Sequence, residues 1–382
     1  SSSSAASDVY KRQPISAYIT MLHDKVEKEN IHMHLYTNPA QGYLPDEILA
    51  KAEDLFDQAE AAVADDAGLL ERVKVCRMPL TYAKLFPRNG YTIANEKLTF
   101  NGPLAPLTEV QEMLRRMEAH GFKTVREVGG DPKTLGMMAA AFTLPMDAPR
   151  ITNGLLTVDM VPMLGGRMLR LIHEPTGECV TAYNVTRYLI FPFGGGEETR
   201  WGGIFRPTGF FDQYAVVEKA ADHVVMRTQS GVRQVDRAIS LLPDAPIVKV
   251  KATLTNTSDK PQEITVRSHL ELDLGDVYQT RVAFTNRKGE TVQKDMRPII
   301  ANLREGEHYY DQDCPKDAWT LTGTKGLAVT QRWHDAATDF AWLYAYPDYL
   351  NDLEAELWNK EVVVQPGEST VFEHELEVRA AG

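Results

Sequence analysis

Three ionisable side chains alternate along one short segment of the sequence, at His269, Glu271 and Asp273. Residues two apart in a β-strand point to the same face, so the segment predicts that these three project together while Leu270 and Leu272 point the other way. Such a group is either a solvated strand surface or the floor of a polar cleft. The leucines on the opposite face favour a central strand and therefore a cleft.

A carboxylate and an indole alternate in the same way farther along the chain, at Glu356 and Trp358. Proteins commonly hold sugars by hydrogen bonds from hydroxyls to a carboxylate, with the C–H face of the sugar laid on an aromatic ring. Trp201 is the first of several aromatic residues between 201 and 214. Core packing accounts for most of that group, and Trp201 is the first candidate in it for stacking against a sugar.

The segment 151–171 reads as two strands on either side of the paired glycines Gly165 and Gly166. Alternating apolar residues predict one face of each strand on a core and the other toward solvent. Glycine allows a positive φ or a close approach of the backbone, and Arg167 follows with a planar fork of donors suited to paired hydroxyls or a carboxylate. The simpler alternative is a strand bend followed by a surface arginine.

Turn signals complete the strand pattern. The segments 251–276 and 356–378 each read as two strands joined by a polar turn, at 256–261 and 365–368, which is typical of hairpins. The glycines at 194–196 lack the Lys-Ser/Thr ending of a phosphate-binding loop and fit a flexible lip of a cleft.

The motifs GLLTVDMVPMLGGRMLRL, ATLTNTSDKPQEITVRSHLELDLG and AELWNKEVVVQPGES, in this order, resemble the galactose-mutarotase-like superfamily over about 149–378. The resemblance implies a large antiparallel β-sandwich that binds saccharides in a cleft. It also implies that His269 and Glu356 occupy the places of a catalytic acid and base. Epimerases of the superfamily carry an earlier histidine before a Gly-Phe pair, where this chain has Thr208; His173 or His223 could supply the missing group, or both are surface histidines.

The segment before the sandwich has a helical pattern. Residues 1–13 look like a translated sequencing adapter, so a first helix is expected from Ser16, as its cap, to Glu29. A second helix is expected from Pro45 toward Asp66, with a regular apolar stripe. A third is expected over 69–85, with Cys76 facing inward and Pro79 kinking or interrupting it, and further helices over 107–119 and 132–141.

The motifs SAYITMLHDKV, HMHLY, GYLPDEILAKAEDLFDQAEAAV and LLERVKVCRMPLTYAKL are similar to the helical tail of an uncharacterised bacterial family. Members of that family place this tail behind a glycoside-hydrolase-like barrel related to α-glucuronidases and hexosaminidases. The resemblance implies that a catalytic barrel lies upstream as a partner domain of the same polypeptide, and that the saccharide is a uronic acid or hexosamine glycan. The expected organisation is a segment 1–13 outside the fold, a helical region 14–148 and a β-sandwich 149–382.

Composition excludes some classes of protein. The 382 residues carry a net charge of −12, which argues against a nucleic-acid partner, and no apolar run approaches the length of a membrane span. The three cysteines are isolated and suggest neither a disulfide framework nor a zinc site. His32 and His34 alternate without a nearby third ligand, so neither a metal nor a cofactor is expected.

Taken together, the sequence predicts an α+β chain of several domains, an N-terminal helical bundle followed by a large antiparallel β-sandwich. Three functions remain open. The first is a carbohydrate-binding ancillary region of a larger glycoside hydrolase, holding a glycan through groups of the sandwich: Arg167, His173, Trp201, His269, Glu271, Asp273, Glu356 and Trp358. The second is an aldose 1-epimerase that uses Glu356 as base and His269 as acid. The third is a structural domain that packs on the upstream barrel.

Overall fold

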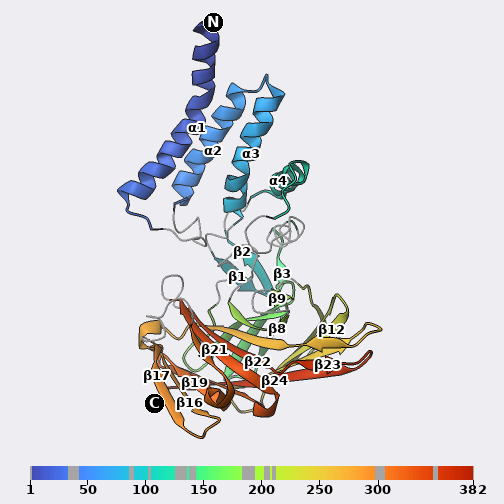
Figure 1. Ribbon diagram of the computed structural model, residues 1–382. Coiled ribbons are helices and arrows are strands. Elements are labelled where there is room, and N and C mark those ends of the chain that lie inside the picture. Colours follow the sequence, from blue (N-terminus) through green and yellow to red (C-terminus); the bar gives the residue numbers. More distant parts are fainter. Residues whose placement is uncertain are drawn as a thin grey trace. The chain divides into compact units, whose positions relative to one another are not determined.

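The computed structural model in Figure 1 describes most of the chain. The described residues are 2–32, 43–85, 90–101, 105–124, 136, 143–182, 194–201, 207–208, 212–296, 306–346 and 352–381, without side chains for 2–11, 197, 199–201, 207–208, 346 and 352. The chain forms two compact units. One comprises residues 1–92, 99–145 and 186–190, and the other comprises 93–98, 146–185 and 191–382.

The described residues of the first unit form four helices. Their bounds are α1 Ser2–Lys28, α2 Asp46–Ala62, α3 Ala67–Lys84 and α4 Leu107–Ala119. In α2 the predicted apolar stripe is confirmed, because Ile48, Leu49, Ala52, Phe56 and Ala59 are buried. The expected helix over 107–119 is also confirmed, whereas the one over 132–141 falls largely outside the described residues.

Three details of the helices differ from the expectations. Helix α1 begins at Ser2, and Ser16 lies inside it, two residues after Pro14. Helix α3 continues through Pro79 to Lys84. Cys76 is exposed, although it lies on the same face of the helix as the buried Leu80.

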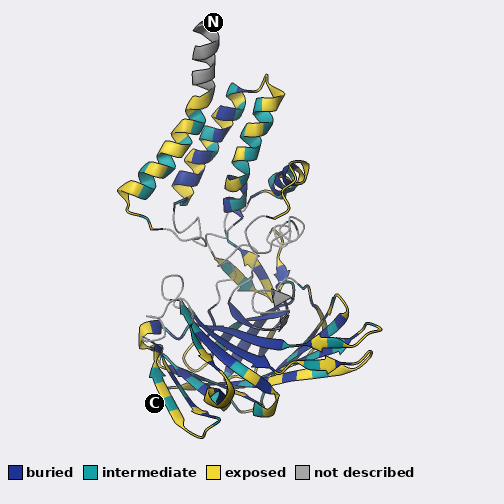
Figure 2. Ribbon diagram, in the orientation of Figure 1, coloured by how far each residue is buried: buried dark blue, intermediate teal, exposed yellow. Residues whose placement is uncertain are grey.

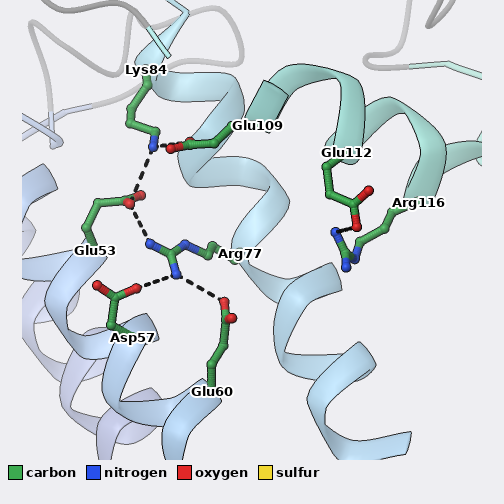
Figure 3. A network of polar contacts seen from close by, with 8 residues as sticks. All are labelled: Glu53, Asp57, Glu60, Arg77, Lys84, Glu109, Glu112 and Arg116. Atoms are coloured by element: carbon green, nitrogen blue, oxygen red, sulfur yellow. Dashed lines mark hydrogen bonds and ion pairs between the residues drawn. The ribbon is translucent and has the colours of Figure 1, made fainter. Parts of the chain in front are cut away.

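A network of ion pairs connects α2, α3 and α4 (Figure 3). The guanidinium of Arg77 lies 2.6 Å from a carboxylate oxygen of Glu53, 2.6 Å from Asp57 and 3.0 Å from Glu60. Lys84 pairs with both Glu53 and Glu109. One cation therefore holds three carboxylates of successive turns of α2, and a second cation extends the network to α4.

The second unit is a two-sheet β-sandwich, so the predicted fold class is confirmed. The first sheet has the order β10-β11-β12-β13-β24-β20-β19-β16-β17. Its strands are β10 Ala215–Lys219, β11 His223–Ser230, β12 Arg233–Leu241, β13 Ile247–Asn256, β16 Arg281–Asn286, β17 Thr291–Asp295, β19 Pro315–Thr322, β20 Leu327–Trp333 and β24 Ser369–Ala380.

The second sheet has the order β18-β21-β22-β15-β8-β6-β5-β4, with β7 beside β6 and β9 beside β8. Its strands are β4 Arg150–Thr152, β5 Leu156–Val161, β6 Arg167–His173, β7 Glu178–Cys179, β8 Gly195–Trp201, β9 Pro207–Thr208, β15 Val266–Leu272, β18 Glu307–Tyr309, β21 Thr338–Tyr346 and β22 Asp352–Asn359. A small separate sheet contains β1 Tyr91–Ala94, β2 Lys97–Phe100 and β3 Met146–Asp147, and short 3₁₀ helices are η1 Val277–Gln279, η2 Asp311–Asp313 and η3 Asp335–Ala337.

The two predicted hairpins are wrong, because each pair of strands divides between the sheets. Strand β13 belongs to the first sheet and β15 to the second, while β22 belongs to the second and β24 to the first. At both of these turns the chain therefore crosses from one sheet to the other. The crossing segments carry β14 Gln262–Ile264 and β23 Val362–Val364, which pair with each other in a small antiparallel ribbon.

One apolar core fills the space between the two sheets. On the second sheet one row of core residues runs across β6, β8, β15, β22 and β21. Its members are Met168, Gly196, Leu270, Ala355 and Leu343, which lie side by side on the inner face. Figure 2 shows the resulting burial along the middle strands of the sandwich. All six residues of β5 are buried, so the expected solvent face of that strand does not exist. Among the described residues, no helix combines the length and the apolar character of a membrane span.

Candidate functional site

The outer face of the second sheet, the one opposite to the core, carries a compact set of charged and aromatic side chains. Strand register places them in three rows across β15, β22 and β21. The rows are Arg267–Trp358–Phe340, His269–Glu356–Trp342 and Glu271–Glu354–Tyr344. Directly opposite residues in neighbouring antiparallel strands have Cβ atoms about 5 Å apart, so the rows form one contiguous surface.

His269 lies at the centre of this outer-face cluster. Its Nε2 atom is 3.6 Å from a carboxylate oxygen of Glu271, 3.8 Å from Glu356 and 3.9 Å from Glu354. These distances exceed those of hydrogen bonds, so the contacts are electrostatic. The imidazole is 2% exposed, and the carboxylates around it are also buried. Three carboxylates thus converge on one ring nitrogen of a buried imidazole.

Glu356 has two further partners on the same face. Arg267 donates to Oε1 of Glu356 over 2.6 Å, and the indole N–H of Trp358 donates to its Oε2 over 3.2 Å. The predicted pairing of Glu356 with Trp358 on one face is therefore confirmed. Trp358 is 2% exposed and packs on Phe340 and Trp342, with ring centroids 5.1 Å and 5.0 Å away. Its role in stacking on a sugar stays a prediction.

Arg167 approaches the cluster from β6 and meets Glu271 at one backbone position. Arg167 donates to the carbonyl of Gly194 over 2.6 Å, and the amide of Gly194 donates to Glu271. Burial lowers the pKa of Arg167 to about 9, against the opposing effect of Glu271. Gly165 and Gly166 both have a positive φ, as expected for the turn that leads into Arg167.

The glycines at 194–196 have a different role from the predicted flexible lip. Gly195 and Gly196 begin β8, and a Cβ on Gly195 would lie 1.9 Å from the carbonyl oxygen of Met168. A Cβ on Gly196 would lie 2.7 Å from the side chain of Leu270. These glycines therefore allow β8 to pass close to β6 and β15 beneath the site.

Three of the predicted residues do not join the cluster, namely Asp273, His173 and His223. Asp273 follows the end of β15 and forms an ion pair with Lys325 over 2.9 Å, because the strand ends at Leu272. His173 lies at the far end of β6 from Arg167, and a bulge at Leu169 turns it to the opposite face. Burial lowers its pKa, and Thr176 is its hydrogen-bond partner.

His223 is a partly exposed residue that pairs with Glu218 and Asp222. The side chains of Trp201 and Thr208 lie outside the described residues. The roles assigned to Trp201, and to Thr208 in place of a histidine, thus stay predictions.

A second polar network lies between the two sheets, and it shares only β15 with the outer-face cluster. Glu198 of β8 accepts hydrogen bonds from Arg237 of β12 and His374 of β24. Ser268 and Gln331 complete it through contacts with His374 of 3.2 Å and 3.3 Å. Burial acts to raise the pKa of Glu198, but Arg237 and His374 outweigh it and lower the pKa to about 2.

Arg237 also connects this network to the turn that carries Arg167. Besides Glu198, it donates to the carbonyls of Gly166 and Gly196, the latter over 2.9 Å. One guanidinium from the first sheet thus fixes the backbone of two strands of the second sheet, directly beside the outer-face cluster.

Several residues of the site escaped the sequence analysis, namely Arg267, Glu354, Trp342 and Tyr344. The alternating pattern could have identified two of them. Arg267 lies two residues before His269, and Glu354 lies two residues before Glu356, so each continues the period of two on its strand. The inner network has no comparable signal, because its members come from five strands that are distant along the chain.

The donor set of His269, Glu271 and Glu354 has the chemistry of a metal site, with one ligand atom of each within 4.8 Å of the others. Arg167 lies near Glu271, and Arg267 pairs with the neighbouring Glu356. The two guanidinium groups therefore offset part of the negative charge of the cluster.

Comparisons with known proteins concern the β-sandwich. No protein-family model matches the chain, and no curated protein matches it. Among solved structures, this chain is similar to a galactose mutarotase related enzyme from Lactobacillus acidophilus. The two share 12% sequence identity with a TM-score of 0.46, and the match covers 61% of this chain and 98% of that one. It is similar to a galactose mutarotase-like protein from Lactobacillus casei ATCC 334, with 11% identity, a TM-score of 0.46, and coverage of 61% and 100%.

A TPR-domain containing protein from Parabacteroides distasonis ATCC 8503 is also similar, with 14% identity, a TM-score of 0.48, and coverage of 62% of this chain and 47% of that one. Two of these three proteins carry the name of the superfamily that the sequence motifs resemble. With TM-scores below 0.5, what this chain binds has to be argued from its own side chains.

Proposed function

We propose that the outer-face cluster of the second sheet binds a saccharide. The observation that carries this proposal is the convergence of three carboxylates on His269 Nε2, at 3.6–3.9 Å, on a face that also presents indole and phenol rings. Carboxylates accept hydrogen bonds from sugar hydroxyls, and aromatic rings pack against sugar C–H groups. Buried ionisable groups cost stability, and such groups gather at functional sites.

The charges of the cluster favour an acidic or amino sugar as the ligand. Arg167 and Arg267 add positive charge to the cluster, which suits the carboxylate of a uronic acid. Glu271 and Glu354 supply acceptors that suit the N–H of a hexosamine. We further propose that the sandwich serves as an ancillary region of a larger glycoside hydrolase, whose barrel would lie upstream in the same polypeptide.

A second candidate function is aldose 1-epimerisation, favoured by the 3.8 Å distance between His269 Nε2 and Glu356 Oε1. In this reaction Glu356 removes the proton of the anomeric hydroxyl while His269 protonates the ring oxygen, so that the bond between C1 and the ring oxygen breaks. After rotation of the aldehyde, the reverse transfers close the ring as the other anomer. Thr208, in place of a histidine, weakens this candidate but leaves binding unaffected.

Isothermal titration calorimetry tests the binding proposal. We expect heat of binding from at least one of glucuronic acid, galacturonic acid, glucosamine and N-acetylglucosamine, and loss of that heat in Glu356→Gln. Asp273→Asn is the matched control, because Asp273 pairs with Lys325 outside the cluster. Absence of binding by every sugar, from folded protein, would overturn the proposal and favour a structural domain. Polarimetry then decides on epimerisation, which the uncatalysed mutarotation rate would exclude.

A further inference from the structure

A set of aromatic rings continues the outer-face cluster toward the edge of the second sheet. We call it the aromatic shelf, and its members come from β18, β21 and β22 or directly follow β18: His308, Tyr310, Phe340, Trp342, Tyr344 and Trp358. The alternate residues of the same strands, such as Tyr309, Ala341 and Leu343, belong to the core. The shelf is therefore on the outer face, where core packing does not require aromatic residues.

The rings of the shelf contact one another in a continuous series. The His308 ring stacks on Trp342 with centroids 4.6 Å apart, and Phe340 stacks on Trp358 at 5.1 Å. Tyr310 lies against Phe340 with centroids 5.3 Å apart. Both stacked pairs have an interplanar angle of 25°, so the two rings of each pair lie nearly face to face.

The edge of the shelf is polar and accessible, whereas its base is buried. Tyr310 is 45% exposed and His308 is exposed, while Trp342 beneath them is buried. The hydroxyl of Tyr310 accepts a hydrogen bond from the indole N–H of Trp342 over 3.0 Å, and His308 Nε2 lies 2.8 Å from the hydroxyl of Tyr344. Ring faces combined with hydroxyl and imidazole groups are the chemistry that recognises a pyranose.

Strand register joins the shelf to the cluster without a gap. His308 lies opposite Trp342, and Trp342 lies opposite Glu356, so one row leads from the carboxylate to the exposed histidine. Neighbouring strands are about 4.8 Å apart, which places His308 roughly 10 Å from Glu356 at the level of the backbone. That distance is on the order of the length of a disaccharide, and it runs outward from the buried cluster to the exposed edge.

We propose that the aromatic shelf is a second sugar subsite, so that the ligand is a disaccharide or a longer oligosaccharide. The reducing-end sugar binds at His269 and Glu356, and the next sugar stacks on the shelf at Tyr310 and His308. This inference rests on the proposed function, because it extends the same binding face. It adds to that function the size of the ligand and the residues that contact its second sugar.

The test compares sugars that share a reducing end. Isothermal titration is carried out with N-acetylglucosamine against N,N′-diacetylchitobiose, and with glucose against cellobiose and maltose. We expect at least one disaccharide to bind roughly three- to tenfold more tightly than its monosaccharide, which is the range for one stacked ring. In Tyr310→Ala we expect that advantage to disappear while the affinity for the monosaccharide stays within twofold.

Tyr278→Ala is the matched control, because Tyr278 is a similarly exposed tyrosine on η1, away from the shelf. His308→Ala is a second variant, with the same expected selective loss. Equal affinities for monosaccharide and disaccharide, unchanged in Tyr310→Ala, would overturn the subsite and leave the proposed function standing. Failure of every sugar to bind would overturn both the subsite and the proposed function. Loss of the disaccharide advantage in Tyr278→Ala, but not in Tyr310→Ala, would overturn the assignment of the subsite to the aromatic shelf.

Discussion

The buried pair of Glu198 and Arg237 offers the sharpest test of how the site is held. The perturbation is Glu198→Gln, which keeps the size of the side chain and removes its charge. Both partners are about 1% exposed or less at the side chain, so solvent screens their interaction very little. The variant leaves the guanidinium of Arg237 in the core without its carboxylate, and His374 loses the same anion.

The magnitude follows from the structure. A pKa that falls from 4.5 to about 2 corresponds to roughly 3 kcal/mol of stabilisation of the ionised Glu198. Removal of one partner of a buried pair costs about 3–5 kcal/mol, which agrees. Arg237→Met adds a second cost, because the carbonyls of Gly166 and Gly196 lose a donor, at about 1–3 kcal/mol each. In the double variant we expect the costs to be less than additive by about 2 kcal/mol.

Tryptophan fluorescence during urea unfolding is the suitable assay, because all five tryptophans of the chain lie at position 201 or beyond and report on the sandwich unit alone. Asp236→Asn is the control, since its pair with Arg227 is more exposed and is worth less than about 1 kcal/mol. The reasoning is refuted if Glu198→Gln costs no more than this control, or if the costs of the two substitutions simply add.

Further predictions concern the glycine of β8, acid stability, metal and the helical unit. Gly195→Ala should lower the melting temperature strongly, because the added Cβ would collide with the carbonyl oxygen of Met168. Scanning fluorimetry measures this change. A Tm within about 1–2 °C of the parent's, on the order of measurement scatter, would contradict the prediction. Since the folded pKa of Glu198 is depressed, its contribution is present above pH about 4.5 and is lost as the pH falls toward 2, so urea unfolding at pH 3 should show a smaller difference between the parent and Glu198→Gln than at pH 7. Dialysis against EDTA should change neither Tm nor sugar binding, because Arg167 and Arg267 already offset part of the charge of the carboxylates. A Tm that rises on adding Zn²⁺ would count against this prediction. Arg77→Gln should reduce the stability of the helical unit by about 1–3 kcal/mol in far-UV circular dichroism, and an unchanged transition would mean that the network in Figure 3 is not cooperative.

The sequence was most informative where a pattern is local. A period of two along β15 and β22 was enough to place His269 and Glu271 on one face, and Glu356 and Trp358 on another strand's face. The apolar period in α2 likewise determined which side of the helix is buried. Such patterns depend only on the geometry of one element, so they can be read without knowing the neighbours.

Pairing between distant strands could not be read in this way. The turns at 256–261 and 365–368 have ordinary hairpin residues, yet each leads to the opposite sheet, because strand pairing is decided by the core that forms between the sheets. The bulge at Leu169 is similar: it adds one residue, and this reverses the face of His173 relative to Arg167. Asp273 continued a correct pattern one step beyond the point where the strand ends.

The inner polar network lies beneath the outer-face cluster, so β15 carries polar side chains on both faces. On β15 the residues Arg267 and His269 face outward while Ser268, between them, faces the buried Glu198 and His374. At this point the second sheet is therefore polar on both faces, which lowers the stability that an apolar strand would give. What it provides is rigidity, because the strand that carries His269 is hydrogen-bonded to side chains from both sheets and cannot shift without breaking buried charge pairs. A sequence that only needed to fold would place apolar residues there, so the two polar networks are the physical reason for placing the proposed binding site on β15.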